Sequence, residues 1–483
     1  MMKHKHRLAA ALIALVLTLG LLVGTMPAAL ATEPDEEPEA ATQAAAFTVV
    51  NPYEAVDWAS FGQYKAALHV HTTHSDGSAT PAETVRRHYH LGFDILAITD
   101  HNALLNRWDE RPQYGFNWFR RLHNFFRGQV LLTTEEKAAI YAGAYPSDTR
   151  QQLNGMISLP AINEQSRAEH VNTFWAPFNN SYRDNIESVL QRTTELGGIA
   201  ILNHPGRYTG GRYANEYGEA ASNDPAVIQR YVNWFGMFDV ALGMEIFNRL
   251  DRETASERIL WDNVLMALMP YGRPVWGFSN DDSHSVNCVG YNWNVMLMPE
   301  LTAEATRTAM ETGAFYAVTR VARREGVNAD QPSRGSYDTL FLLNQPTPGI
   351  DNIEVAGDTI TITGRDYDTI EWIADGRVIH TGATLDLAER AGSIGHSYVR
   401  AQLLSETGAA MTQPFGIWWG AGIYPETLVM EVVIPDPPAL WPLLIPVPGT
   451  GMSLWQVSLI VLLILTAVVT LAAILKRRKR KVI

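Results

Sequence analysis

The stretch AALHVHTTHSDGSATP, residues 66–81, contains the clearest structural signal in the chain. A short apolar run leads into His69 and His71, and Asp76 follows in a loop of small polar residues. Thr80-Pro81-Ala82-Glu83 is a capping-box sequence with proline at the first helical position. The stretch therefore predicts a strand, a loop that carries metal-ligand side chains, and then a helix.

The same arrangement recurs downstream, because further strand-like runs also end in side chains that bind metals. The runs are FDILAIT before Asp100 and His101, MISLPAI before Glu164 and His170, GIAIL before Asn203 and His204, VALGMEIF with Glu245, and PVWGF before Asp281, Asp282 and His284. The carboxyl ends of parallel strands meet on one face of a sheet or barrel, so we expect these groups to converge. The candidate metal ligands are His69, His71, Asp76, His101, Glu164, His170, His204, Asp282 and His284.

The chemistry of this set predicts a cluster of transition-metal ions. Imidazole and carboxylate ligands without thiolate suit Mn, Zn or Fe. The set is too large for one four-coordinate zinc ion, so we predict two or three divalent ions that share carboxylates. Such a cluster activates water and neutralises the negative charge of a phosphoester.

The ordered motifs HVHTTHSDGSATP, ITDHN, NEQSRAEHVN, NHPG and DDSH closely resemble those of the PHP (polymerase and histidinol phosphatase) superfamily of metal-dependent phosphoesterases. The likeness covers about residues 62–322. It implies a distorted (β/α)7 barrel, a two- or three-metal site formed by the nine candidates, and a small phosphoester substrate, with nucleotides among the candidates. It also implies that Glu164 is the bridging carboxylate and that His170 is its partner.

Two residues are predicted to act in catalysis. His204, or a water molecule, assists the leaving group, and Arg207 clamps a phosphate from the loop after Asn203-His204-Pro205-Gly206. Arg212 is a second candidate for the clamp. A solvated loop arginine is the alternative interpretation for both arginines.

Several other residues near the motifs have two possible roles. Glu135 and Glu136 compete with Glu164 for the bridging position, but Thr133-Thr134-Glu135-Glu136 is typical of a helix start. We expect Asp100 to orient a ligand, Asp281 and Glu245 either to reach the site or to hold structure, and Cys288 to be a buried small residue. His74, His88, His90 and His123 are expected to be surface or helix residues. The aromatic residues between His101 and Gly155 form either a lid or, more in keeping with their spacing, a helix that packs on the barrel.

The middle of the chain divides into two folded regions. Alternating strand and helix patterns predict an α/β domain over residues 62–340. Period-two alternation with Gly-Asp and Asp-Gly turns predicts a small all-β, sandwich-like domain over residues 341–430. The patterns predict an α/β fold class with a parallel sheet or barrel, and the resemblance implies that this is a distorted (β/α)7 barrel, followed by the β domain and a C-terminal transmembrane helix.

The two ends predict an exported protein with one membrane span. Residues 1–31 are typical of a signal peptide and residues 32–61 of an acidic linker. A Pro-rich stalk over 431–452 precedes the span at 453–475, where Leu454–Leu475 carries no charge, and a basic cytoplasmic tail over 476–483. We expect a single-pass cell-membrane protein whose catalytic domain is extracellular.

Composition narrows the possible partners. The formal charge is −13, and nine cations lie in the two acid-free terminal segments, so the central part is more acidic still. A stable nucleic-acid complex is therefore not expected. With one cysteine the chain has no internal disulfide.

The predicted function is metal-dependent phosphoester hydrolysis. The alternatives are a surface binding or adhesion protein that uses the barrel as a platform, and an amide or lactone hydrolase.

Overall fold

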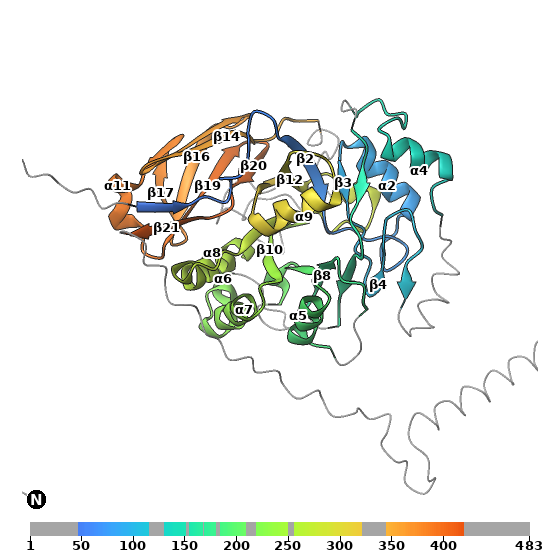
Figure 1. The fold of residues 1–483 in the computed structure, drawn as a ribbon, viewed down its shortest axis with the longest axis horizontal. Coiled ribbons are helices and arrows are strands. Elements are labelled where there is room, and N and C mark those ends of the chain that lie inside the picture. Colours follow the sequence, from blue (N-terminus) through green and yellow to red (C-terminus); the bar gives the residue numbers. More distant parts are fainter. Residues whose placement is uncertain are drawn as a thin grey trace, which may run out of the picture. The chain divides into compact units, whose positions relative to one another are not determined.

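The strand-like runs of the sequence form two sheets that meet at the predicted site in the computed structural model. The structure describes residues 47–114, 130–150, 154–167, 169–179, 184–208, 219–249, 256–320 and 344–419. These residues belong to one compact unit, Ala45–Ile483. Figure 1 shows the ribbon, with the C-terminal strands in orange.

One sheet has five strands in the order β11-β10-β9-β8-β7. The strands are β7 (Asn163–Gln165), β8 (Val171–Phe174), β9 (Ile199–Leu202), β10 (Ala241–Asn248) and β11 (Trp276–Asn280). β9, β10 and β11 run parallel, whereas β8 is antiparallel to both of its neighbours. Every residue of these strands is buried, which explains why they appear in the sequence as continuous runs with little alternation.

The larger sheet follows the path β1-β21-β19-β20-β13-β12-β2-β3-β6. The strands of this sheet that lie before residue 320 are β1 (Phe47–Val50), β2 (Gly62–Ala67), β3 (Ile95–Leu96), β6 (Ile157–Ser158), β12 (Asn292–Met298) and β13 (Phe315–Thr319). β2, β3 and β6 are parallel, and β12 is antiparallel to β2 and β13. A separate antiparallel pair consists of β4 (Ala103–Leu104) and β5 (Gln113–Tyr114).

Two single-residue bridges connect the sheets. Val70, after β2, pairs with Ser283, after β11, and His101, after β3, pairs with Glu164 in β7. The pairing within the described segments therefore consists of ladders and isolated bridges, and it does not confirm the predicted seven-stranded barrel. Both bridges involve residues of the ligand motifs or their direct neighbours, so the site lies where the two sheets meet.

Helices connect the strands and cover the sheets. They are α2 (Pro81–His90), α4 (Thr134–Tyr141), α5 (Ile186–Glu195), α6 (Glu219–Ser222), α7 (Pro225–Met237), α8 (Glu257–Leu268) and α9 (Ala303–Thr312), with 3-10 turns η1 (Pro205–Arg207), η2 (Met269–Tyr271) and η3 (Val286–Cys288). The predicted capping box is confirmed, since Thr80 and Glu83 cap α2 reciprocally. α5 ends in the same local way that glycine commonly ends helices: Gly197, with φ +67°, follows the cap residue Leu196.

The C-terminal region is antiparallel, as predicted. It contains β14 (Gly349–Ala356), β15 (Thr359–Arg365), β16 (Thr369–Ala374), β17 (Arg377–Thr381), β18 (Thr384–Asp386), β19 (Tyr398–Ser405), β20 (Gly408–Met411) and β21 (Phe415–Trp419), with α11 (Leu387–Arg390) and η4 (Ala391–Ser393). β14, β15 and β18 form a three-stranded sheet, and their inward side chains share one core with the larger sheet. Because β20 pairs with β13, one sheet runs through both predicted domains.

The N-terminal boundary differs from the prediction. β1 lies inside residues 32–61, the segment predicted as linker, and pairs with β21 from Phe47↔Trp419 to Val50↔Gly416. In Figure 1 this blue strand lies beside β21. An acidic, proline-rich composition describes residues 32–46 but not Phe47–Val50, whose apolar side chains allow strand pairing.

Some predictions fall outside the described residues. These concern the signal peptide, the stalk, the span at Leu454–Leu475, the basic tail, and residues 115–129 of the aromatic insertion. Of the helices that the structure does describe, none has the length and apolar character needed to cross a membrane.

Candidate metal centre

The structure brings all nine predicted ligands together at the ends of the strands. His69 and His71 follow β2, His101 follows β3, Glu164 lies in β7, His170 precedes β8, His204 follows β9, and Asp282 and His284 follow β11. Asp76 is in the loop between β2 and α2. Their nitrogen and oxygen atoms form four overlapping groups in which the potential ligand atoms lie within 4.8 Å of one another: His71–Asp76–His101–His284, His69–His71–Asp282, His69–Glu164–His204 and His101–Glu164–His170.

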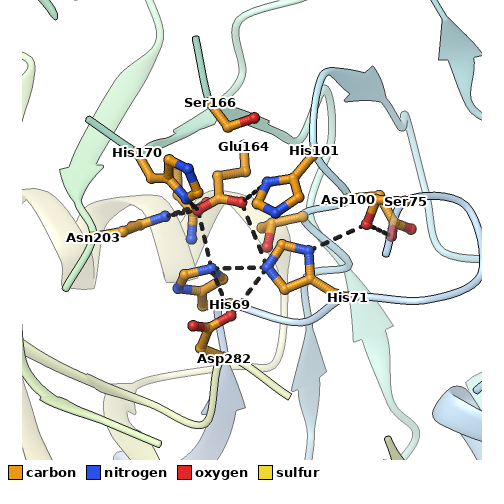
Figure 2. A network of polar contacts seen from close by, with 12 residues as sticks. His69, His71, Ser75, Asp100, His101, Glu164, Ser166, His170, Asn203 and Asp282 are labelled. Carbon is orange, nitrogen blue, oxygen red and sulfur yellow. Dashed lines mark hydrogen bonds and ion pairs between the residues drawn. The ribbon is translucent and has the colours of Figure 1, made fainter. Parts of the chain in front are cut away.

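Glu164 is at the centre of the cluster and is fully buried (Figure 2). Its Oε1 lies 3.2 Å from His69 Nε2 and 2.9 Å from His170 Nδ1, and its Oε2 lies 3.4 Å from His71 Nε2. His101 Nδ1 also contacts Oε2. The carboxylate is therefore shared by two ligand groups, which is the arrangement of a bridging ligand.

Asp282 lies on the opposite side of the two histidines that follow β2. Its Oδ1 is 3.3 Å from His69 Nε2 and 3.1 Å from His71 Nε2. The residue adopts φ +45°, in the left-handed region, so the backbone turns sharply directly after β11. After that turn, the Asp282 carboxylate oxygen Oδ1 lies 3.5 Å from His284 Nδ1.

The third carboxylate, Asp76, belongs to the most accessible group. Its Oδ2 lies 3.5 Å from His101 Nε2 and 3.3 Å from His284 Nε2. The Asp76 side chain is 55% exposed and that of His284 27%, whereas the side chains of His69 and Glu164 are inaccessible to solvent. The cluster therefore has an inner, buried part and an outer part that faces solvent.

Glu245 in β10 holds the ring of His69. Its Oε1 is 2.8 Å from His69 Nδ1 and accepts from Asn280 Nδ2 at 2.9 Å. Its Oε2 accepts from the His204 backbone amide at 2.7 Å and from Asn248 Nδ2 at 2.8 Å. With its proton on Nδ1, His69 directs the lone pair of Nε2 at Glu164, Asp282 and His71.

This geometry requires positive charge between the ligands. Burial opposes charge on every group, but Glu245, Asp282 and Glu164 raise the pKa of His69 well above its usual value. Glu164 and Asp76 likewise raise the pKa of His101 to about 10 despite its burial. Metal ions would replace the protons that these two rings otherwise hold.

The pKa values of the carboxylates shift in the opposite direction. Burial raises their pKa values, but the surrounding imidazoles outweigh it and keep the pKa of Glu164 well below its usual range. His69, His71 and Arg249 do the same for Asp282. Burial lowers the pKa of His71 to about 4 and that of His204 well below its usual value, so both rings are neutral near pH 7. The set therefore offers carboxylates, two neutral imidazoles and, at His69 and His101, two rings whose protons a metal ion would replace, and such oxygen and nitrogen ligands suit borderline divalent metals.

Two arginines approach the site at Asp282. Arg249, directly after β10, donates from Nε to Asp282 Oδ2 at 2.8 Å, and Arg207 Nη1 lies 3.9 Å from the same oxygen. The side chains of Arg207 and Arg249 are 22% and 25% exposed. Arg207 was predicted from the sequence, and Arg249 was missed although it also follows a strand-like run. Arg212 lies outside the described residues.

The ambiguous acidic residues have distinct places. Asp100 accepts hydrogen bonds from Thr72 and Ser75, in keeping with the predicted orienting role. Asp281 accepts from the backbone amides of Gly290, Tyr291 and Asn292 and belongs to none of the four ligand groups. Burial raises its pKa to about 7. Glu135 and Glu136 are in the first turn of α4, as their sequence indicated.

The remaining histidines and the cysteine are outside the ligand groups. His88 is buried in α2 with Nδ1 2.8 Å from the Thr84 carbonyl, and His90 Nδ1 is 2.8 Å from Ser147 Oγ. His74 is buried near Asp100, with 3.8 Å between Nδ1 and Oδ2, and was wrongly expected at the surface or in a helix. Cys288 is exposed, contrary to expectation, because η3 turns it outward. His123 lies outside the described residues.

Among known proteins, the chain is similar to several solved structures. No protein-family model matches the chain, and neither does any curated protein. A two-domain protein from Bacteroides vulgatus ATCC 8482, described as containing a predicted PHP-like metal-dependent phosphoesterase, is 14% identical with TM-score 0.34, over 75% of this chain and 88% of that one.

Two other solved structures are similar over about half of this chain. The lesion-specific endonuclease PfuEndoQ from Pyrococcus furiosus is 12% identical with TM-score 0.28, over 52% of this chain and 56% of that one. An amidohydrolase from Chromobacterium violaceum is 13% identical with TM-score 0.26, over 46% and 87%. Because these scores and identities are low, we infer function from the geometry of the site.

Proposed function

We propose that the protein is a metal-dependent hydrolase of phosphoester bonds. The observation that carries this proposal is the convergence of six imidazoles and three carboxylates into four overlapping ligand groups, with Glu164 shared between two of them. Lone pairs and carboxylates that face one another in a buried site need cations between them. Two or three Mn, Zn or Fe ions satisfy this need better than protons alone.

The ligand groups suggest how the ions are distributed. His69, Glu164 and His204 would hold a buried ion, and His101 and His170 would share Glu164 with a second one. His71, Asp76, His101 and His284 would hold an ion nearer to solvent. Such ions, when bound, lower the pKa of water and neutralise charge on phosphoester oxygens.

The protein's own side chains favour an anionic substrate. Arg207 and Arg249 are partly accessible and lie at the Asp282 side of the cluster. Guanidinium groups bind phosphate oxygens through paired, charge-assisted hydrogen bonds. A neutral amide or lactone has no charge for them to bind, and a purely structural metal site needs no accessible arginines, so phosphoester hydrolysis accounts for more of the site than either alternative.

Of the two predicted catalytic residues, we assign different roles to each. Arg207 binds a phosphate oxygen and orients the substrate. His204 Nε2 lies 3.8 Å from Glu164 Oε1, and burial keeps its pKa well below its usual value. A neutral ring with an available lone pair is suited to metal binding, so we favour that role for His204 over proton donation to the leaving group.

A test separates the proposal from its alternatives. The purified protein is assayed for metal content and for hydrolysis of a phosphomonoester, a phosphodiester, an amide and a lactone. We expect two to three ions per chain and cleavage of a phosphoester. The Glu164→Gln variant is expected to lose metal and activity because the shared carboxylate is gone, whereas Glu135→Gln, exposed in α4, keeps both.

Other outcomes would change the assignment. Bound metal with amide or lactone cleavage would identify a different hydrolase, and bound metal without any cleavage would favour the surface-binding alternative. If Glu164→Gln kept the metal and Glu135→Gln lost it, the bridging carboxylate would have been misassigned.

We also propose that the protein acts at the cell surface on a small phosphoester, with nucleotides among the candidate substrates. Support comes from the sequence of the two ends, with a signal-peptide pattern over residues 1–31 and an uncharged run before the basic cluster at 476–481. Protease added to intact cells is expected to degrade the folded region. Complete protection in intact cells, with degradation after lysis, would exclude the extracellular location.

A further inference from the structure

The loop that carries the first ligand motif is held by one buried carboxylate, that of Asp100. Its Oδ1 accepts from the Thr72 backbone amide at 2.8 Å and from Ser75 Oγ at 2.5 Å. Its Oδ2 accepts from Thr72 Oγ1 at 2.6 Å. Ser75 Oγ in turn lies 3.3 Å from His71 Nδ1, and Figure 2 shows His71, Ser75 and Asp100 in a row beside the cluster.

The protons in this row can be assigned from distances. The Ser75 hydroxyl has one proton, and its contact with Asp100 Oδ1 at 2.5 Å is much shorter than its contact with Asp76 Oδ1 at 3.3 Å. The proton therefore goes to Asp100, and the lone pairs of Ser75 Oγ face His71 Nδ1. His71 then donates from Nδ1, because an unprotonated Nδ1 would face an oxygen lone pair.

The tautomer of His71 decides what its other nitrogen can do. With the proton on Nδ1, Nε2 presents a lone pair 3.1 Å from Asp282 Oδ1 and 3.4 Å from Glu164 Oε2. His69 has the same tautomer but receives it directly from the carboxylate of Glu245. The neutral hydroxyl of Ser75 thus separates the His71 ring from the carboxylate of Asp100, whereas the His69 ring contacts the carboxylate of Glu245 directly.

We propose that Ser75 and Asp100 form a hydroxyl–carboxylate relay that fixes the metal-binding tautomer of His71. They are positioning residues, and they set the affinity of the ligand groups that contain His71 without setting that of His69–Glu164–His204. The inference rests on the proposed metal centre. It predicts that the ion nearest to solvent depends on a hydroxyl that touches no metal.

The test uses the full-length protein with Ser75→Ala, and Ser78→Ala as matched control. Ser78 is in the same loop, and its hydroxyl donates only to the His284 carbonyl, while its backbone amide keeps the loop attached to that carbonyl at 2.7 Å. Zinc affinity is measured by competition with a chromogenic chelator. We expect Ser75→Ala to lower the affinity for at least one zinc ion by about 10- to 100-fold, while the affinity for the most tightly bound ion is unchanged. Ser78→Ala is expected to match wild type.

Two further measurements separate tautomer control from loop packing. Ser75→Thr keeps the hydroxyl and is expected to restore zinc affinity. In ¹⁵N-histidine NMR spectra of the zinc-loaded protein, His71 is expected to show the Nδ1–H tautomer in wild type and Ser75→Thr, and to lose this fixed signature in Ser75→Ala. Asp100→Asn, which keeps the shape of the carboxylate, should weaken the same ion and serves if Ser75→Ala does not fold.

The results that overturn the relay differ from those that overturn the metal centre. Wild type that binds neither zinc nor, in the metal analysis, manganese or iron would contradict the proposed function itself. The relay alone would be overturned if wild type bound zinc and Ser75→Ala kept a zinc affinity within twofold of wild type at every ion. The His71 signature in Ser75→Ala would then also be unchanged. Equal weakening by Ser78→Ala would assign the effect to loop packing, which also overturns it.

Discussion

Arg207 and Arg249 touch the same oxygen of Asp282 but at different distances, and we expect different consequences when each is replaced. Arg207→Met, 3.9 Å away, removes substrate attraction and should raise KM for a phosphoester about 10-fold or more, with metal content unchanged. Arg249→Met, which loses a 2.8 Å hydrogen bond, should also lower metal content because Asp282 is no longer oriented. Steady-state kinetics and metal analysis check both. An unchanged KM for Arg207→Met would remove it from the substrate site.

His88 predicts a pH dependence of stability that is separate from the metal centre. Burial lowers its pKa in the folded protein to about 4, below the ordinary value of 6.5. The neutral ring therefore favours the folded state fully above pH 6.5, and this contribution is lost as the pH falls through 4. The loss is on the order of 3 kcal/mol at most.

The measurement compares Tm at pH 7.5 and pH 4.5, with chelator present, for wild type and His88→Leu. The variant should lose less stability between the two pH values, even if it is less stable at both. An identical pH dependence in the two proteins would show that His88 does not control acid unfolding.

At the residue scale, the sequence was sufficient to predict the ligand types and the orienting role of Asp100, but not the contacts that hold each ligand ring. Each of the nine predicted ligands follows or lies in a strand-like run, and strand ends converge, so their convergence could be expected. The contacts of Ser75 with His71 and of Glu245 with His69 depend on the orientation of the imidazole rings, which no sequence spacing encodes. Cys288 was expected inside because cysteine is usually buried, but its position depends on the turn η3.

At the scale of elements, the loop between β2 and α2 tolerates little change at Gly77. A Cβ atom there would lie 2.8 Å from the backbone of His71 and Thr72. Gly77→Ala should therefore displace His71 and reduce metal content, whereas Gly392→Ala, in η4 with nothing within 4 Å, should have no effect. Metal analysis at equal folded protein concentration checks this. Full metal content in Gly77→Ala would show that the loop can move without cost to the site.

The elements themselves were predicted better than their pairing. The capping box at Thr80 and the helix start at Thr133 are local signals, and both mark helix ends in the structure. A barrel depends on which strands become neighbours, and within the described residues the strand pairing between the two sheets consists of the isolated bridges Val70↔Ser283 and His101↔Glu164. Single-residue pairing leaves no alternation or run in the sequence that would reveal it.

For the whole molecule, the pair Asp262–Arg400 connects α8 to the C-terminal strands. Arg400 donates from Nε and Nη2 to Asp262 at 2.8 Å and 2.7 Å, and both residues are buried. α8 also packs on η1 and β10, which carry Arg207 and Glu245. A long-range ion pair and the β13–β20 ladder join the two regions that the sequence indicated as an α/β domain and a β domain.

Arg400→Leu is expected to destabilise the protein by about 3 to 5 kcal/mol, because Asp262 would keep a buried charge without its partner. Unfolding should remain a single transition. Arg377→Leu, whose side chain is 67% exposed beside Asp375, should change stability by less than about 1 kcal/mol. Denaturant titrations of the three proteins check these values. Two separate transitions in wild type would show that the regions fold independently.

The pairing of β1 with β21 also determines how the fold responds to tension. Phe47 faces Trp419 across antiparallel strands, so the first and last described residues lie at the same end of one ladder. A force that pulls these two residues apart breaks the ladder bonds one after another, as in a zip, and not all at once as in shear. Single-molecule stretching from these points should show an early step at low force. The four residues of β1 would thus detach at low force, before the force reaches the strands around the metal centre.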